Sequence, residues 1–130
     1  MPLPALGAVL LALGVLFGAF GAHGLEGRVT PERMDTWNTA ALYHLVNALG
    51  ILVLGTLKEL APDRVAARPV AFILMGAVVF PGSLYALVLL DVQWLGAIAP
   101  LGGISLVVGW MGIGLGELRR KSTGHSDSTQ

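Results

Sequence analysis

The sequence contains no cysteine and few charged residues. Eight Lys or Arg and eight Asp or Glu are distributed over 130 residues, which gives a formal net charge of zero. The absence of cysteine excludes disulfides, thiolate catalysis and cysteine-ligated metal sites. The low, balanced charge lacks the basic surface that binding to a phosphate backbone requires. We therefore expect no nucleic-acid partner.

Charged residues are also absent from the interiors of four long apolar stretches. We predict these stretches to be spans that cover about residues 2–23, 36–58, 70–90 and 94–117. Each is long enough to cross a hydrocarbon core about 30 Å thick. The sequence thus predicts an all-α integral membrane protein: one four-span helical bundle over residues 1–121, followed by a polar, disordered tail over residues 122–130.

The basic residues predict how this bundle is oriented. Only Arg28 and Arg33 lie between the first two spans. The other six lie on the side that holds both termini; they are Lys58, Arg64, Arg68, Arg119, Arg120 and Lys121. Because cytoplasmic loops carry an excess of Lys and Arg, we expect both termini in the cytoplasm. At the other face, Trp37 is placed to anchor the second span at the outer interface.

Two prolines predict irregular backbone within the spans. Pro81 removes one helical hydrogen bond and collides with the carbonyl group of Ala77, so a kink is expected in the third span. Pro100 is followed by two glycines and predicts a similar irregularity, with an irregular or half-helical start to the fourth span over residues 91–103.

Glycines recur every seven residues in the first and fourth spans, and two Gly-x-x-x-Gly motifs accompany them. The glycines predicted to pack helices are Gly7, Gly14, Gly18, Gly21, Gly102, Gly109, Gly112 and Gly116. Such stripes let helix backbones approach closely. The pattern leaves open whether they pack within one protomer or between protomers. Because two stripes exceed what one helix pair needs, we expect a homo-oligomer.

Polar residues form one face of the second span. Tyr43, His44 and Asn47 lie within one helical arc, while leucine and valine occupy the opposite arc. Their spacing allows a shared hydrogen-bonded cluster. Residues of the other spans reach the same outer half of the bundle. The candidate ligand-binding set is His23, Tyr43, His44, Asn47, Ser83 and Tyr85.

Several of these strings resemble one known family. They are GAFGAHGL at residues 18–25, Tyr43–His44 with Asn47–Leu49, FPGSLY at residues 80–85, and PLGG at residues 100–103 with Trp110. They are similar to the signature of the small four-span proteins classed as domain of unknown function 423, a family that includes human transmembrane protein 256. The resemblance implies a four-helix membrane fold and a bacterial inner-membrane (plasma-membrane) location, without an established activity. The family commonly has histidine where this chain has Asn47, and serine where it has Pro81.

Four roles remain open for the polar cluster. His44 can fix helix register by bonding Asn47 and Tyr43. The cluster can instead line a pocket for a lipid, a quinone or another amphipathic molecule. A small-solute or proton path is disfavoured because no charged residue lies in the middle of a span. Haem ligation by His23 and His44 is the fourth.

Catalysis has little support in the sequence. A hydrolase is disfavoured because the chain lacks a Gly-x-Ser-x-Gly motif and an acidic residue placed to orient the histidine. We expect a structural or binding component of the membrane, not an enzyme, with no cofactor or metal. Its expected partners are membrane lipids, further copies of itself and a lipid-like small molecule.

Overall fold

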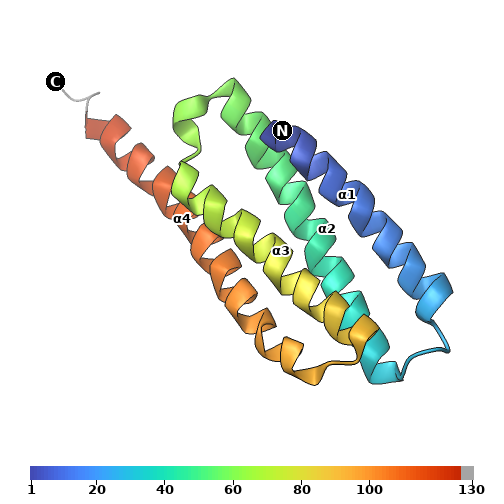
Figure 1. Cartoon of the computed structure of the whole chain (residues 1–130). Helices are drawn as coiled ribbons and strands as arrows, with labels where there is room; N and C mark the ends of the chain where they lie inside the picture. Colours follow the sequence, from blue (N-terminus) through green and yellow to red (C-terminus); the bar gives the residue numbers. More distant parts are fainter. Residues whose placement is uncertain (127–130) are drawn as a thin grey trace.

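The structure is a computed structural model that describes residues 1–126 of the chain. Within these residues every regular element is a helix (Figure 1). The elements are α1 (Leu3–Phe20) with a π-helical turn η1 (Gly21–Leu25), α2 (Pro31–Leu60), a 3₁₀ turn η2 (Pro62–Arg64), α3 (Ala67–Leu90), a 3₁₀ turn η3 (Gln93–Ala97) and α4 (Ala99–Ser126). All four long helices are long and apolar enough to cross a membrane. The predicted four-span all-α fold is confirmed.

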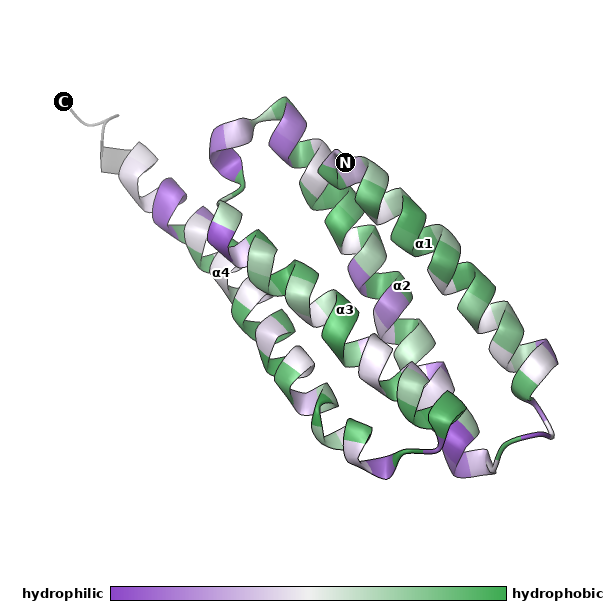
Figure 2. Cartoon of the chain, viewed as in Figure 1, coloured by the Kyte–Doolittle hydropathy of each residue, from purple (hydrophilic) through white to green (hydrophobic). Residues whose placement is uncertain are grey.

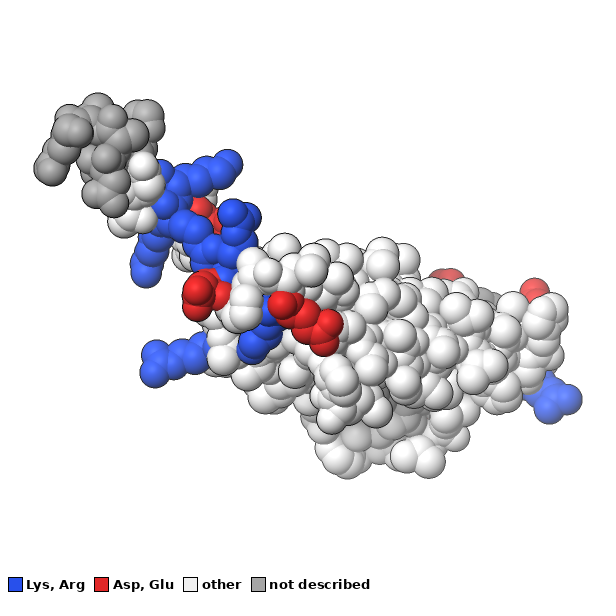
Figure 3. Space-filling model, turned by 90° about the horizontal axis from the view of Figure 1, so that it is seen from above, with Lys and Arg blue, Asp and Glu red and all other residues white. Residues whose placement is uncertain are grey.

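The helices are arranged as a row in chain order. Extensive contacts join α1 to α2, α2 to α3 and α3 to α4. Figure 2 shows apolar residues over most of each helix and polar residues mainly at the helix ends, with a few in the middle of α2. Lys and Arg gather mainly at the end that holds the N-terminus, the α2–α3 connection and the end of α4 (Figures 1 and 3). We call this the basic end, and the other the opposite end.

The start of α2 follows the sequence signals closely. Thr30 caps the helix, because its hydroxyl oxygen accepts a hydrogen bond of 3.3 Å from the backbone amide of Arg33. Pro31 occupies the first helical position, where its missing N–H costs nothing, and Glu32 lies favourably in the first turn.

The main break in the chain lies between α3 and α4. Pro81 lies inside α3, which continues as one helix to Leu90. Asp91 then takes a left-handed conformation with φ of 54°, and η3 follows. The irregular segment predicted for residues 91–103 is therefore confined to 91–98, because Pro100 fits the first turn of α4, where no amide hydrogen is needed.

The fourth helix is longer than predicted. It continues to Ser126, so the disorder predicted from residue 122 is corrected for residues 122–126. The Thr123 hydroxyl donates a hydrogen bond of 2.9 Å to the carbonyl oxygen of Arg120 one turn earlier, which keeps a polar side chain compatible with the helix. The rest of the predicted tail, residues 127–130, lies outside the described residues.

The glycine stripes pack inside the protomer. A Cβ added at Gly7 would lie 2.5 Å from the backbone nitrogen of Leu52 on α2, and one at Gly109 would lie 2.5 Å from Ile73 on α3. Gly14 and Gly21 also face α2, and Gly102 and Gly112 face α3. In contrast, no described atom would lie within 4 Å of a Cβ at Gly18 or Gly116, so their predicted packing role is not supported within the protomer. Gly116 keeps the seven-residue spacing of Gly102 and Gly109, but Gly112 already faces Pro69 near the start of α3, so Gly116 lies beyond the end of that helix.

Two apolar clusters form the core, one toward each end. The cluster toward the basic end comprises Ile51, Leu54, Val65, Val70, Ile73, Ala77 and Leu106. The cluster toward the opposite end comprises Leu25, Trp37, Ala40, Tyr85, Leu87 and Val88. Trp37 is 1% exposed, so its predicted role as an interface anchor is wrong. Its indole instead fills the space over Gly21. Between these two clusters lie the polar residues of α2.

Candidate functional site

The polar face of α2 is divided between two sides of the row. His44 and Asn47 are both buried, whereas Tyr43 is 45% exposed. His44 contacts side chains of α1 and α3. Asn47 and Tyr43 line a groove between α2 and α4. The single hydrogen-bonded cluster predicted from the sequence is therefore wrong, because adjacent positions on a packed helix face different neighbours.

His44 belongs to an aromatic cluster between α1, α2 and α3. Its Nδ1 lies 3.2 Å from the hydroxyl oxygen of Tyr85. The Tyr85 ring lies 4.5 Å from that of Trp37 and 4.9 Å from that of Phe17, centroid to centroid. Trp37 completes the cluster by donating its indole N–H to the carbonyl oxygen of Phe17 over 2.8 Å. The backbone of Leu10 approaches the His44 ring, yet Nε2 lacks a hydrogen-bond partner among the described residues.

Asn47 joins α2 to α4 through Trp110. Its amide group donates to the carbonyl oxygen of Tyr43 over 2.8 Å, and its side-chain oxygen accepts the indole N–H of Trp110 over 2.9 Å. The Trp110 ring lies over Gly50, where an added Cβ would come within 2.5 Å of it. Sequence reasoning did not place Trp110 or Gly50 in this contact. The signal available was a lone indole N–H within an apolar span, which requires an acceptor.

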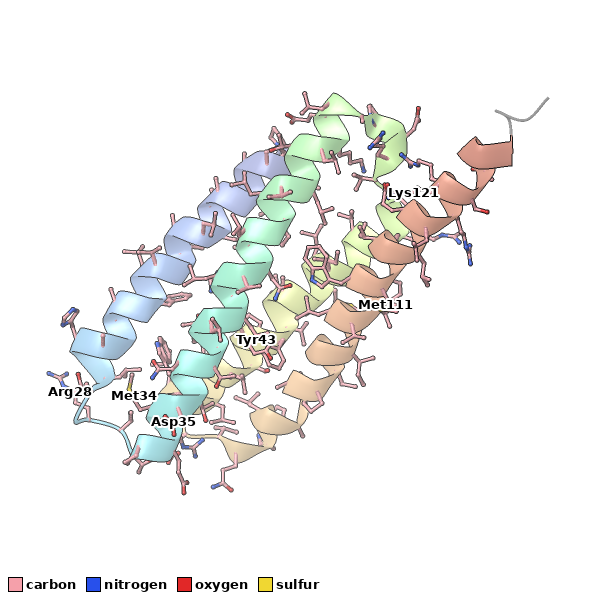
Figure 4. All side chains as sticks on the ribbon, turned by 180° about the vertical axis from the view of Figure 1, so that it is seen from behind. Arg28, Met34, Asp35, Tyr43, Met111 and Lys121 are labelled. Carbon is pink, nitrogen blue, oxygen red and sulfur yellow. The ribbon has the colours of Figure 1, made fainter. Side chains whose placement is uncertain are left out.

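A groove of about 810 Å³ lies beside this contact. It is lined by Tyr43, Val46, Asn47, Phe80, Pro100, Gly103, Ile104, Leu106, Val107, Val108, Trp110 and Met111. Figure 4 shows Tyr43 and Met111 on α2 and α4, on either side of the space between these helices. The Tyr43 ring packs edge-on against Phe80, with centroids 4.9 Å apart. In the described part of the chain its hydroxyl group makes no hydrogen bond.

The other predicted site residues lie elsewhere. His23 is exposed in η1, and among residues 1–126 it makes no hydrogen bond or ring contact with His44. Ser83 is buried, but its hydroxyl donates to the carbonyl oxygen of Phe80 in its own helix over 2.9 Å. The described residues contain no group of three His, Cys, Asp or Glu that could hold a metal. The six predicted site residues thus form two pairs, His44 with Tyr85 and Tyr43 with Asn47. His23 and Ser83 belong to neither pair.

A comparison with known proteins shows to which family this chain belongs. Residues 17–103 match the model described as protein of unknown function DUF423. The chain belongs to this family. It is 38% identical over 107 residues to the UPF0382 membrane protein YwdK of Bacillus subtilis, covering 82% of this chain and 87% of that protein. A UPF0382 membrane protein of Staphylococcus epidermidis is 41% identical over 106 residues, covering 82% of this chain and 86% of the relative.

Another relative extends the match over more of the chain. The UPF0382 membrane protein of Staphylococcus saprophyticus is 36% identical over 115 residues, covering 88% of this chain and 94% of that protein. No solved structure matches this member of the DUF423 family. The four apolar helices and the bacterial relatives identify it as a multi-pass plasma-membrane protein of a family without an assigned activity.

Proposed function

We propose that this protein binds one amphipathic membrane molecule in the groove between α2 and α4, and that it acts by binding and not by catalysis. The observation that carries this proposal is the hydroxyl group of Tyr43, a residue that lines an almost wholly apolar groove. It makes no hydrogen bond within the described residues. An unpaired hydroxyl group surrounded by hydrocarbon is costly. A ligand with an acceptor, such as an ester or quinone carbonyl oxygen, removes that cost.

The position of Tyr43 supports one orientation of such a ligand. Tyr43 is 12 residues after the start of α2, about 18 Å along the helix at 1.5 Å per residue. Asn47 is already engaged by Trp110, so Tyr43 is the free polar group of the groove. The polar part of the ligand therefore meets Tyr43, and its apolar chain packs along Phe80, Ile104 and Val107.

The two tyrosines of the chain supply a matched test. Tyr43→Phe and Tyr85→Phe each delete one hydroxyl group with little change in volume, but only Tyr43 lines the groove. Native mass spectrometry of protein released from mild detergent reports bound molecules. We expect Tyr43→Phe to lose most of the co-purifying ligand and Tyr85→Phe to retain it. Gly103→Leu, which fills the groove, should also lose it. Wild-type protein without any bound molecule, or equal retention by all variants, contradicts the proposal.

A structural role for His44 accompanies this proposal. The His44 ring is hydrogen-bonded to the hydroxyl group of Tyr85, and the Ser83 hydroxyl donates to the carbonyl oxygen of Phe80 in its own helix. Ser83 and His44 therefore do not form a pair of nucleophile and base. We expect His44→Gln, which keeps a donor and an acceptor, to preserve folding and bound ligand. Loss of ligand from a folded His44→Gln protein would indicate that the titratable ring has a chemical role.

The proposed orientation places the basic end in the cytoplasm. It is supported by six Lys and Arg at that end against two at the other. Because the chain lacks cysteine, single cysteines report topology directly. Cysteine at Thr30 should react with an impermeant thiol reagent in intact cells, and cysteine at Ala66 should not. The reverse pattern would overturn this orientation.

Assembly into a homo-oligomer remains a proposal with less support than the sequence suggested. Its main argument was a surplus of glycine stripes, and these pack inside the protomer. The remaining support is the largely exposed apolar surface of α1 and the open positions Gly18 and Gly116. The mass of the intact complex in the same native spectra tests whether the protein is a homo-oligomer. Spectra that contain only the monomer would contradict this proposal.

A further inference from the structure

A second cleft lies at the basic end, between the starts of α1 and α3. It has a volume of about 390 Å³ and is lined by Leu3, Pro4, Gly55, Lys58, Glu59, Val70 and Leu74. Pro4 rests directly on α2, since a Cβ at Gly55 would lie 2.5 Å from its backbone nitrogen. This close contact brings α1 against the last turns of α2 and leaves the space between α1 and α3 unfilled. The walls contributed by α1 and α3 are apolar.

Lys58 is the one basic side chain that lines this cleft. It is half-buried in the last turn of α2. Within residues 1–126 it forms no ion pair or side-chain hydrogen bond. Its neighbour Glu59 also lines the cleft, but is exposed and free to turn toward water. The cationic side chain of Lys58 lies beside an apolar cleft at the end of a membrane-spanning helix. This arrangement fits a molecule with an anionic head and an apolar chain.

We propose that this cleft binds an anionic glycerophospholipid, with its phosphate group on Lys58 and one acyl chain between Leu3 and Leu74. Charge complementarity selects the headgroup, because six of the eight basic residues lie at this end of the bundle. The apolar walls select an acyl chain over a soluble anion. The site shares no residue with the groove between α2 and α4, which lies toward the other end.

The two lysines of the chain provide the control. Lys58→Gln and Lys121→Gln remove the same charge from the basic end, but Lys121 is exposed on α4 and does not line the cleft. Purified full-length protein is mixed with phosphatidylglycerol or phosphatidylcholine, and native mass spectrometry counts the bound lipids. We expect wild-type protein to prefer phosphatidylglycerol. Lys58→Gln should lower this binding by about fivefold, since a basic group near an anionic surface contributes that much affinity. Lys121→Gln should change it much less.

A second pair of measurements distinguishes binding in the cleft from diffuse attraction of lipid to the basic end. Leu74→Trp fills the cleft without altering charge, and should also abolish the preference for phosphatidylglycerol. Inorganic phosphate, which lacks a chain, should not displace the lipid. Equal losses in both lysine variants would show diffuse attraction and overturn the proposal. So would a lower melting temperature of Lys58→Gln with unchanged lipid binding, because Lys58 would then only complement the dipole of α2. Retention of the groove ligand by Lys58→Gln keeps this result separate from the proposed function.

Discussion

The space between α1 and α3 and the space between α2 and α4 are each filled at one end of the bundle, but not at the same end. Toward the opposite end, the rings of Phe17 and Tyr85 close the first space, and toward the basic end it remains open as a cleft. Trp110 closes the space between α2 and α4 by resting on Gly50. Toward the opposite end this space remains open as a groove. Glycines bring α1 close to α2 and α3 close to α4. Second neighbours in the row lie farther apart, so only large side chains bridge them. A few aromatic residues therefore decide where each opening lies.

Removing the most deeply buried ring should have the largest effect. Trp37→Ala empties a site that is 1% exposed and deletes the bond to Phe17. We expect a loss of about 3–5 kcal/mol, typical of a buried Trp→Ala change. Unfolding in detergent, followed by circular dichroism, measures this loss. Trp94→Ala is the control, because Trp94 is 66% exposed, and its effect should be small. Equal effects would mean that Trp37 does not fill the space between the helices.

Separating two neighbouring helices should cost somewhat less. Gly109→Leu forces a side chain into Ile73 and the backbone of α3, whereas a Cβ added at Gly116 would have no described atom within 4 Å outside its own helix. We expect Gly109→Leu to lose about 1–3 kcal/mol, as overpacked cores do. Thermal melting in detergent is the measurement. Gly7→Leu and Gly18→Leu repeat the comparison on α1, and similar melting temperatures within either pair would show that the stripe faces lipid.

Trp110→Phe sharpens the comparison at the groove. It keeps a ring over Gly50 but removes the N–H, so the side-chain oxygen of Asn47 loses its partner. We expect a loss of about 1 kcal/mol, and retention of the groove ligand because Tyr43 is untouched. Thermal melting and native mass spectrometry test both expectations. Loss of ligand without loss of stability would place the ligand on Trp110 instead.

The smallest effect is expected at the exposed ion pair of the opposite end. A guanidinium nitrogen of Arg33 lies 2.6 Å from Oδ1 of Asp91, and the Asp91 side chain is 83% exposed. Arg33→Gln should lose no more than about 1 kcal/mol, and the loss should shrink in high salt. Melting temperatures at two salt concentrations measure it. A larger, salt-independent loss would show that this pair holds Asp91 in its left-handed conformation.

The sequence predicts the spans well and the site only in part. Apolar runs and proline or threonine signals determine where a helix lies, because these are local properties. Partner choice is not local: His44 and Asn47 share a helical arc, yet one meets Tyr85 and the other Trp110. The glycines of α1 and α4 were visible as a stripe, whereas Gly50, Gly55 and Gly76 pack singly and give no repeat. Which glycines receive a neighbour depends on helix rotation, which a single-helix pattern does not contain.

The order of the helices in the row has a consequence for how the chain folds. Each of α2, α3 and α4 packs against the helix before it. A helix that enters the membrane during synthesis therefore finds a neighbour already in place, and no helix waits for a distant segment. Contacts close in sequence are made quickly. The bridging rings of Tyr85 and Trp110 come from later helices, so the cleft and the groove are shaped last, on a framework that the glycines have already set.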